Sequence, residues 1–381
     1  MLGIIQEQHP DRARLFMQWK EMGWPILVDS YNLLEVPYVP ITVALDEAGV
    51  VTKLLGPLQD EGPLGSDFVA ETFPASEGAG ASPPAVPDHE SLAQTARAES
   101  SPESWRAFGD AVAVWGGPDR ATDAIEAFEE VVRATPDDGL AHFRLGVAYR
   151  MRYDSEGRRD ADFQKAVAHW GTALEIDPNQ YIWRRRIQQY GPRLDKPYPF
   201  YDWVPTAREE IAARGDVPSP LVVEPRGSEF AEPVEAFATA DRPVAEPDPL
   251  GRVLRDDGEF IAVETTAVPS AVPPGEVARV HFTFRPIVEQ LAHWNNEADD
   301  MVVWVDPPEG WDVDSPMTVY SVPPEMVSQE TRSVEVEIRA APSAEGDVTI
   351  PAYALYYVCE DINGVCMYRR HDLDVEVSIE R

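Results

Sequence analysis

The chain has 381 residues, with 67 Asp and Glu against 32 Lys and Arg, so its formal net charge is −35. An acidic surface of this kind repels phosphate backbones and anionic membranes, which argues against nucleic-acid binding as a function. No run of eighteen apolar residues is present, so no membrane-spanning helix is expected.

Basic residues are mostly arginine, because the lysines are only Lys20, Lys53, Lys165 and Lys196. High acidity with few lysines predicts a halophilic protein, since salt screens the self-repulsion. A GC-rich genome is the alternative explanation for the arginine bias. Residues 1–12 show neither a basic region nor a cleavable apolar stretch, so the chain as given is expected in the cytoplasm. An extracytoplasmic location would follow if the true start lay upstream.

The first segment, residues 1–55, has the pattern of a small α/β unit. Strands are expected at 2–5 and 24–28, on either side of a helix over 11–22 whose apolar residues recur at helical spacing. A hairpin with a Gly-containing turn at 46–49 follows.

This order of strand, helix, strand and proline-opened hairpin resembles the carboxy-terminal part of a thioredoxin-like redoxin domain. Pro40 would take the place of that family's cis-proline, and an ordinary trans turn proline is the alternative. The family's Cys-x-x-Cys helix would lie before Met1, and no cysteine precedes Cys359. We favour a misplaced start over a degenerate half-domain, because half of this fold leaves strands without partners. As given, the segment is catalytically empty.

Two stretches are interpreted as linkers. Gly, Pro, Ala, Ser and Glu dominate residues 56–103, where apolar periodicity disappears, so this stretch is expected to be disordered. Residues 213–249 are also rich in Pro and acidic residues.

Residues 104–212 contain an internal repeat of helical pairs. A small residue, an aromatic residue and a proline recur at the same intervals as Ala124, Phe128 and Pro136, then as Ala166, Trp170 and Pro178. The pattern resembles the tetratricopeptide repeat, in which the small residue lets two helices approach and the aromatic fills the gap. The resemblance implies a concave surface that binds a peptide or protein, and a spacer is the alternative.

Three consecutive arginines, Arg184, Arg185 and Arg186, belong to the last helix of this segment. Local carboxylates are their expected partners, and an anionic ligand is the alternative.

Residues 250–381 carry short alternating segments separated by turns. Strands are expected at 260–264, 277–284, 301–305, 333–339, 349–359, 365–368 and 375–379. Their number and spacing predict an antiparallel, immunoglobulin-like β-sandwich of two sheets. His293 is expected in a loop and is interpreted as a surface residue, the alternative being that it lies over the cysteines.

The two cysteines of the chain, Cys359 and Cys366, flank an Asn-Gly turn on a predicted hairpin. A four-residue loop would place them directly opposite each other, and a two-residue turn would place them diagonally. In both cases their parity puts both sulfurs on one face. The pair is a structural staple, an exchangeable dithiol or a metal site, for which His371 is the nearby further ligand. We favour the dithiol and expect no metal ion.

The residues around this pair resemble the amino-terminal periplasmic domain of the thiol:disulfide interchange protein DsbD. The likeness consists of Tyr-Tyr-Val-Cys, an acidic turn, Gly-Val-Cys and a returning strand that ends in Asp-Val-Glu-Val. It implies an immunoglobulin-like sandwich that passes electrons between thioredoxin-like partners, with Cys366 as the attacking thiol and Cys359 as the resolving thiol. This chain shows no membrane electron-transfer domain, which leaves its electron source open.

The expected fold class is therefore α+β multidomain, with a partial thioredoxin-like segment, helical repeats and a C-terminal sandwich. The leading function is thiol–disulfide exchange with a protein partner through Cys359 and Cys366, without a cofactor. Candidate supporting residues are Pro40, Arg369, Arg370 and His371. The two arginines would favour a thiolate at Cys366. A non-enzymatic adaptor with a structural disulfide is the alternative, and peroxidase activity would need a further cysteine upstream.

Overall fold

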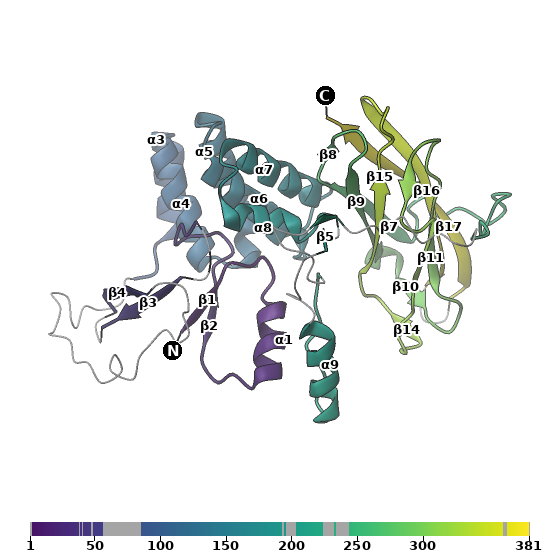
Figure 1. Cartoon of the computed structure of the whole chain (residues 1–381), viewed down its shortest axis with the longest axis horizontal. Coiled ribbons are helices and arrows are strands. Elements are labelled where there is room, and N and C mark those ends of the chain that lie inside the picture. Colours follow the sequence, from purple (N-terminus) through teal and green to yellow (C-terminus); the bar gives the residue numbers. More distant parts are fainter. Residues whose placement is uncertain are drawn as a thin grey trace.

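The computed structural model describes residues 2–37, 39, 41–46, 49–55, 85–192, 194–195, 203–223, 232–233, 244–360 and 364–380. Within these residues the fold is α+β, as expected. Figure 1 shows a group of helices beside a pair of β-sheets, with the N-terminal segment below the helices.

The N-terminal segment has the predicted order of elements. They are β1 (Gly3–Ile5), α1 (Asp11–Lys20), β2 (Ile26–Val28), β3 (Thr42–Leu45) and β4 (Val51–Leu55). β1 and β2 pair in parallel, and β3 and β4 form an antiparallel hairpin. Several apolar residues of these strands are exposed, among them Ile4, Leu27 and Val43. Pro40, the proposed cis-proline position, lies outside the described residues.

Helices form most of the middle of the chain. They are α3 (His89–Glu99), α4 (Pro102–Trp115), η1 (Pro118–Arg120), α5 (Ala121–Ala134), α6 (Gly139–Tyr153), α7 (Asp162–Ile176), α8 (Tyr181–Gln188) and α9 (Trp203–Ala213). Two short strands, β5 (Leu194–Asp195) and β6 (Glu232–Pro233), pair with each other.

Helix α3 lies inside the stretch predicted to be a disordered linker, and this part of the prediction is wrong. Asp88 caps the helix by accepting hydrogen bonds from the backbone of Glu90 and Ser91. Its buried face consists of Ala93 and Ala96, which contact the hydrophobic core that includes α4. A helix whose buried side chains are alanines has the same composition as a linker, so the hydrophobic pattern does not reveal it.

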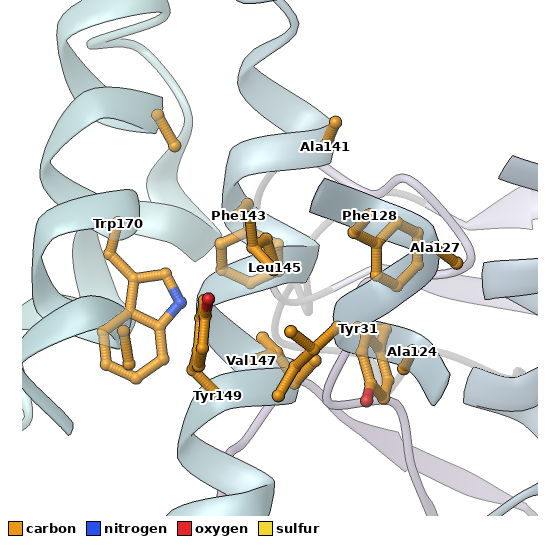
Figure 2. Packing of buried hydrophobic residues seen from close by; sticks show 14 of the residues in the cluster. Tyr31, Ala124, Ala127, Phe128, Ala141, Phe143, Leu145, Val147, Tyr149 and Trp170 are labelled. Carbon is orange, nitrogen blue, oxygen red and sulfur yellow. The ribbon is translucent and has the colours of Figure 1, made fainter. Parts of the chain in front are cut away.

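The aromatic residues singled out in the sequence, Phe128 and Trp170, pack against glycines of the preceding helix. Trp170 of α7 is fully buried and lies so close to Gly146 of α6 that a Cβ there would meet its Nε1 at 2.5 Å. Gly109 of α4 and Phe128 of α5 repeat this contact, with the ring 2.9 Å from the position of a Cβ. Figure 2 shows Trp170 beside α6 and Phe128 in the same core.

The last part of the chain forms two packed sheets. Its elements are β7 (Ile261–Val268), β8 (Ala271–Val272), β9 (Val277–Pro286), η3 (Val288–Gln290), β10 (Ala292–Asn295), β11 (Met301–Val305), β12 (Asp312–Val313), β13 (Met317–Tyr320), β14 (Val327–Ser328), β15 (Arg332–Arg339), β16 (Asp347–Glu360) and β17 (Cys366–Ile379). A four-stranded antiparallel sheet has the order β12-β15-β9-β7. The second sheet has seven strands and contains β16 and β17.

The long strand β16 organises the seven-stranded sheet. β17 pairs along one of its edges, and β11 and β10 pair with successive parts of the other edge. The segments 365–368 and 375–379 were predicted as separate strands, but apart from Val365 they belong to the single strand β17. Apolar residues from both sheets, such as Phe282 and Val336 on one and Ala354 and Tyr356 on the other, form the core between them.

The helices contact the outer face of the four-stranded sheet. Tyr153 of α6 donates a hydrogen bond to Oγ1 of Thr283 at 2.9 Å, and His281 Nε2 lies 2.7 Å from the backbone oxygen of Tyr190. The seven-stranded sheet therefore lies on the side of the sandwich away from the helices, as Figure 1 shows.

The region predicted as the second linker also has structure at its start. Gln18 of α1 donates to the backbone oxygen of Val217 at 2.8 Å and accepts a hydrogen bond from the backbone of Ser219 at 2.9 Å. Trp19 of α1 stacks on Trp203 of α9 with their rings 5.8 Å apart. Residues 217–219 are thus held against α1, and the predicted linker begins too early.

Candidate functional site

Cys359 and Cys366 form a disulfide at the hairpin end of the β16–β17 ribbon. The two residues are direct register partners, their Cα atoms are 3.9 Å apart and the S–S distance is 1.95 Å. Glu360 donates its backbone N–H to Val365, so the cysteines occupy the next, non-hydrogen-bonded position, where Cα atoms approach most closely. This is the directly opposed arrangement expected for a four-residue loop.

The two cysteines differ in their access to solvent. Cys359 is 3% exposed, whereas Cys366 is an exposed residue. A thiolate that approaches from solvent therefore reaches Cys366 and not Cys359. In such an attack, Cys359 would be the sulfur that leaves.

The disulfide lies on the outer face of the seven-stranded sheet. Along β16, the even-numbered residues such as Ala354 and Val358 belong to the core between the sheets. Successive side chains of a strand alternate between faces, so Tyr357 and Cys359 point outward. The sulfurs are consequently not enclosed by the sandwich core.

His293 lies next to the disulfide, on β10. It is the direct register partner of Cys359 on the side opposite Cys366, and it is 5% exposed. Both its predicted loop position and its interpretation as a surface residue are wrong. A clue was present in the sequence, because Ala292 to Asn295 alternate in polarity, but four residues are too few for a firm strand prediction.

A pair of tyrosines lies beside the disulfide, and exposed apolar residues lie nearby at this end of the sheet. Tyr357 and Tyr368, the adjacent register pair on the same face, stack with ring centroids 4.5 Å apart. Burial raises the pKa of Tyr357, and Asp299 adds to this effect. We define the apolar rim as four exposed residues at this end of the sheet: Tyr368 on the face of the disulfide, Val365 next to Cys366 in the chain, and Leu291 and Val327 beside β10. Such a surface suits contact with another protein.

The candidate supporting residues on β17 divide between its two faces. Arg369 and His371 have the opposite parity to Cys366, so they point to the other side of the sheet. His371 Nδ1 lies 3.3 Å from the hydroxyl of Tyr356, and burial lowers the pKa of His371. No group of three His, Cys, Asp or Glu side chains suited to a metal ion occurs among the described residues.

Arg370 shares the face of Cys366 but lies four residues along the strand, about 13 Å away. Its guanidinium bonds Asp248 at 3.0 Å and also bonds Asp372, and it lies 3.7 Å from the ring centroid of Tyr353. These contacts hold Arg370 away from the sulfurs, so the structure brings neither predicted arginine to the disulfide.

Helices α6 and α8 present buried arginines to the chain's own N-terminal segment. Arg186 of α8 is 0% exposed and donates to Gln8 Oε1 at 2.6 Å and to the backbone oxygen of Ser30 at 2.9 Å. Arg144 of α6 donates to the backbone oxygen of Tyr31 at 3.3 Å. The hydrogen-bond partners of Arg186 are neutral oxygens, so for this one arginine the expectation of local carboxylates is wrong.

No described helix is both long enough and apolar enough to span a bilayer. No family model and no curated protein matches the chain. Among solved structures, the sporulation control protein Spo0M from Bacillus subtilis is 10% identical, with a TM-score of 0.16, over 32% of this chain and only 50% of its own.

The bacterial hydrophobin BslA is 12% identical over 32% of this chain and 96% of its own, with a TM-score of 0.17. A PapD-like domain of human CEP192 is 11% identical over 37% of this chain and 94% of its own, with a TM-score of 0.16. Similarities this weak carry no argument about fold or function.

Proposed function

We propose that the chain carries out thiol–disulfide exchange with protein partners through Cys359 and Cys366. The observation that carries the proposal is the asymmetry of the disulfide, with Cys366 exposed and Cys359 buried. Exchange requires one sulfur that a partner can reach and a second sulfur held beside it. The apolar rim at this end of the sheet supports contact with a protein rather than with a small thiol alone.

The reaction balances as a two-electron exchange. A partner thiolate attacks Sγ of Cys366, the Cys359–Cys366 bond breaks, and Cys359 leaves as a thiolate. The second partner thiol then attacks its own sulfur in the mixed disulfide, which releases Cys366. The partner becomes a disulfide and this chain becomes a dithiol. The reverse sequence reduces a partner disulfide.

The resemblance to the DsbD amino-terminal domain supports the same roles, with Cys366 as the attacking thiol. The finer parts of the proposed architecture are an immunoglobulin-like sandwich, tetratricopeptide-like helices and a partial thioredoxin-like segment. The close contact of Gly146 with Trp170 supports the tetratricopeptide-like helices. The β1–α1–β2 unit with its hairpin supports the partial thioredoxin-like segment.

A reduction potential separates an exchanger from a structural staple. We expect the Cys359–Cys366 disulfide to equilibrate with dithiol buffers at a midpoint above about −300 mV, whereas structural disulfides generally lie below that value. Alkylation of the free thiols followed by mass measurement gives the reduced fraction at each buffer ratio. A midpoint well below this value would reject the exchange proposal.

Single-cysteine variants test which sulfur partners reach. Cys359→Ser leaves the exposed Cys366, which we expect to form a mixed disulfide with an aromatic disulfide reagent at least tenfold faster than Cys359 does in Cys366→Ser. The two variants are matched controls for each other, since each removes the same bond. Equal rates would show that burial of Cys359 does not direct the attack.

The second candidate function is an adaptor whose disulfide is structural. The observation in its favour is the length of the ribbon, because residues 347–359 already pair with residues 366–378 without help from the disulfide. Closing so short a loop contributes about 2.5 kcal/mol at most. The reduction potential described above distinguishes this function from exchange.

A further inference from the structure

We infer that His293 takes up and returns the proton of Cys359 during exchange, an inference that rests on the proposed function. His293, Cys359 and Cys366 form one row across β10, β16 and β17, because Cys359 is the register partner of both other residues. Directly opposed residues of antiparallel strands point to the same face, with Cβ atoms about 5 Å apart. The imidazole therefore lies beside the buried sulfur on the side away from the exposed one.

The hydrogen bonding of His293 indicates which ring nitrogen is basic. Its Nδ1 lies 3.4 Å from the backbone oxygen of Leu291. A carbonyl oxygen only accepts hydrogen bonds, so Nδ1 carries the hydrogen in the neutral ring and Nε2 keeps its lone pair. Nε2 is the nitrogen that can accept a proton from a thiol.

Burial makes Cys359 the sulfur that needs this assistance. A thiolate is costly in a site shielded from water, so the thiol of Cys359 does not ionise readily without a partner. A histidine next to a cysteine favours the thiolate through an ion pair. Cys366 is exposed, so water can solvate its thiolate, and it needs no such partner.

The step is as follows when the reduced chain acts on a partner disulfide. The Cys366 thiolate attacks the partner, which forms a mixed disulfide and releases one partner thiolate. Cys359 then attacks Sγ of Cys366, its proton passes to Nε2 of His293, and the second partner sulfur leaves as a thiolate. In the reverse direction, the imidazolium returns the proton to Cys359 as the disulfide opens.

Few other titratable groups lie near His293. Among the described residues, those nearest in register or sequence are Cys359 and Tyr357 on β16, Glu360 at the end of the same strand, Glu289 in η3, and Glu330, whose backbone oxygen accepts from Trp294 of β10. β14, on the other side of β10, carries no titratable side chain. Tyrosine and carboxylate side chains titrate far from the range in which imidazole does, so a histidine contribution can be recognised in a pH profile.

The test is a single-turnover reaction of the reduced full-length protein with dithiodipyridine, an uncharged disulfide that the acidic surface does not repel. Each exchange step releases one absorbing thiopyridone, so attack by Cys366 and resolution by Cys359 appear as two phases. We expect His293→Asn to change the rate of the first phase by less than about twofold and to slow the second phase by about 100-fold. The asparagine amide can still donate to the Leu291 oxygen in place of Nδ1.

The pH profile separates proton transfer from a structural role. Without His293, the rate of the second phase is expected to follow ionisation of the Cys359 thiol alone. Its pH profile should then shift toward alkaline pH, since a buried thiol without a basic partner ionises only at alkaline pH. His371→Asn makes the same change on the opposite face of the sheet and is expected to alter neither phase nor profile. If His293→Asn does not fold, His293→Gln provides the same comparison.

The outcomes are distinct. If the wild-type disulfide neither forms nor opens with the reagent, the proposed function fails. If the wild type shows both phases and the His293 variant shows the same second-phase rate and the same profile, exchange stands and the role of His293 is rejected. Equal slowing of both phases would also reject it, because proton transfer at Cys359 belongs to the second phase alone.

Discussion

Buried polar residues connect the helices to the four-stranded sheet. His281 of β9 is buried, and its Nε2–H donates to the backbone oxygen of Tyr190 at 2.7 Å. The ring of Phe163 lies edge-on at 5.3 Å. Burial lowers the pKa of His281 to about 4. Glu335, 3.5 Å from Nδ1, favours the charged form, but burial has the larger effect, so the ring is neutral at neutral pH.

This residue makes stability depend on pH. In the unfolded chain His281 binds a proton below about pH 6.5, whereas the folded protein excludes that proton until about pH 4. The free energy of unfolding is therefore expected to fall as the pH drops through this range, by about 3 kcal/mol from His281. Urea unfolding at several pH values measures the loss.

The control for this prediction is His281→Gln, whose amide can still donate to Tyr190. It lacks the titrating group, so its stability is expected to fall less between pH 6.5 and pH 4 than that of the wild type. Equal losses in the two proteins would mean that His281 is not a source of the pH dependence.

At the scale of the elements, close approach of paired helices depends on glycine. Gly146 of α6 faces Trp170 of α7, and a Cβ at this position would also lie 3.0 Å from the backbone oxygen of Ala166. The backbone of a helix cannot move as easily as a side chain. The spacing of α6 and α7 therefore requires the absence of a side chain at position 146.

Gly146→Ala is expected to destabilise the protein by about 2 kcal/mol, because the added methyl group overpacks this contact. Gly171→Ala is the matched control in α7, where a Cβ would meet nothing within 4 Å. The control is expected to be neutral or stabilising by up to about 1 kcal/mol, since alanine favours helix. Denaturant unfolding compares both variants with the wild type, and similar effects of the two would contradict the argument.

At the scale of the whole molecule, the N-terminal segment is held against the helices by hydrogen bonds from arginine to backbone and side-chain oxygens. Arg186 bonds Ser30 and Gln8, and Arg144 bonds Tyr31. Tyr31 also contacts Phe128, as Figure 2 shows, with ring centroids 6.1 Å apart. The surface of α6 and α8 that carries these arginines is occupied by the chain itself. A partner of the repeats would have to displace this segment or use another face.

Arg186→Met is expected to loosen this attachment, because it leaves the buried oxygens of Ser30 and Gln8 without this donor. Limited proteolysis should then cleave residues 2–37 at least tenfold faster than in the wild type, while the sandwich stays resistant. Arg184→Met is the control, since Arg184 is only partly buried and donates to the backbone oxygen of Pro178, within its own segment. Unchanged cleavage in Arg186→Met would show that other contacts hold the segment.

Much of the element order could be predicted from the sequence alone. The β–α–β unit, the helical pairs and most strands of the sandwich depend on periodicity and turn residues within short stretches, and the structure contains them. The alternation of side chains along β16 and β17 also predicted that both sulfurs lie on one face of the hairpin. These features are local, so each segment carries the information that determines them.

The tertiary structure decided everything that depends on contacts between distant segments. Pairing of β10 with β16 brought His293 beside Cys359, although the two residues are 66 positions apart in the sequence. Register also turned Arg369 and His371 away from the sulfurs, and packing buried Cys359 while leaving Cys366 exposed. Register and burial arise from the fold as a whole, because a strand's hydrophobic pattern indicates which face is buried but not which strand lies next to it.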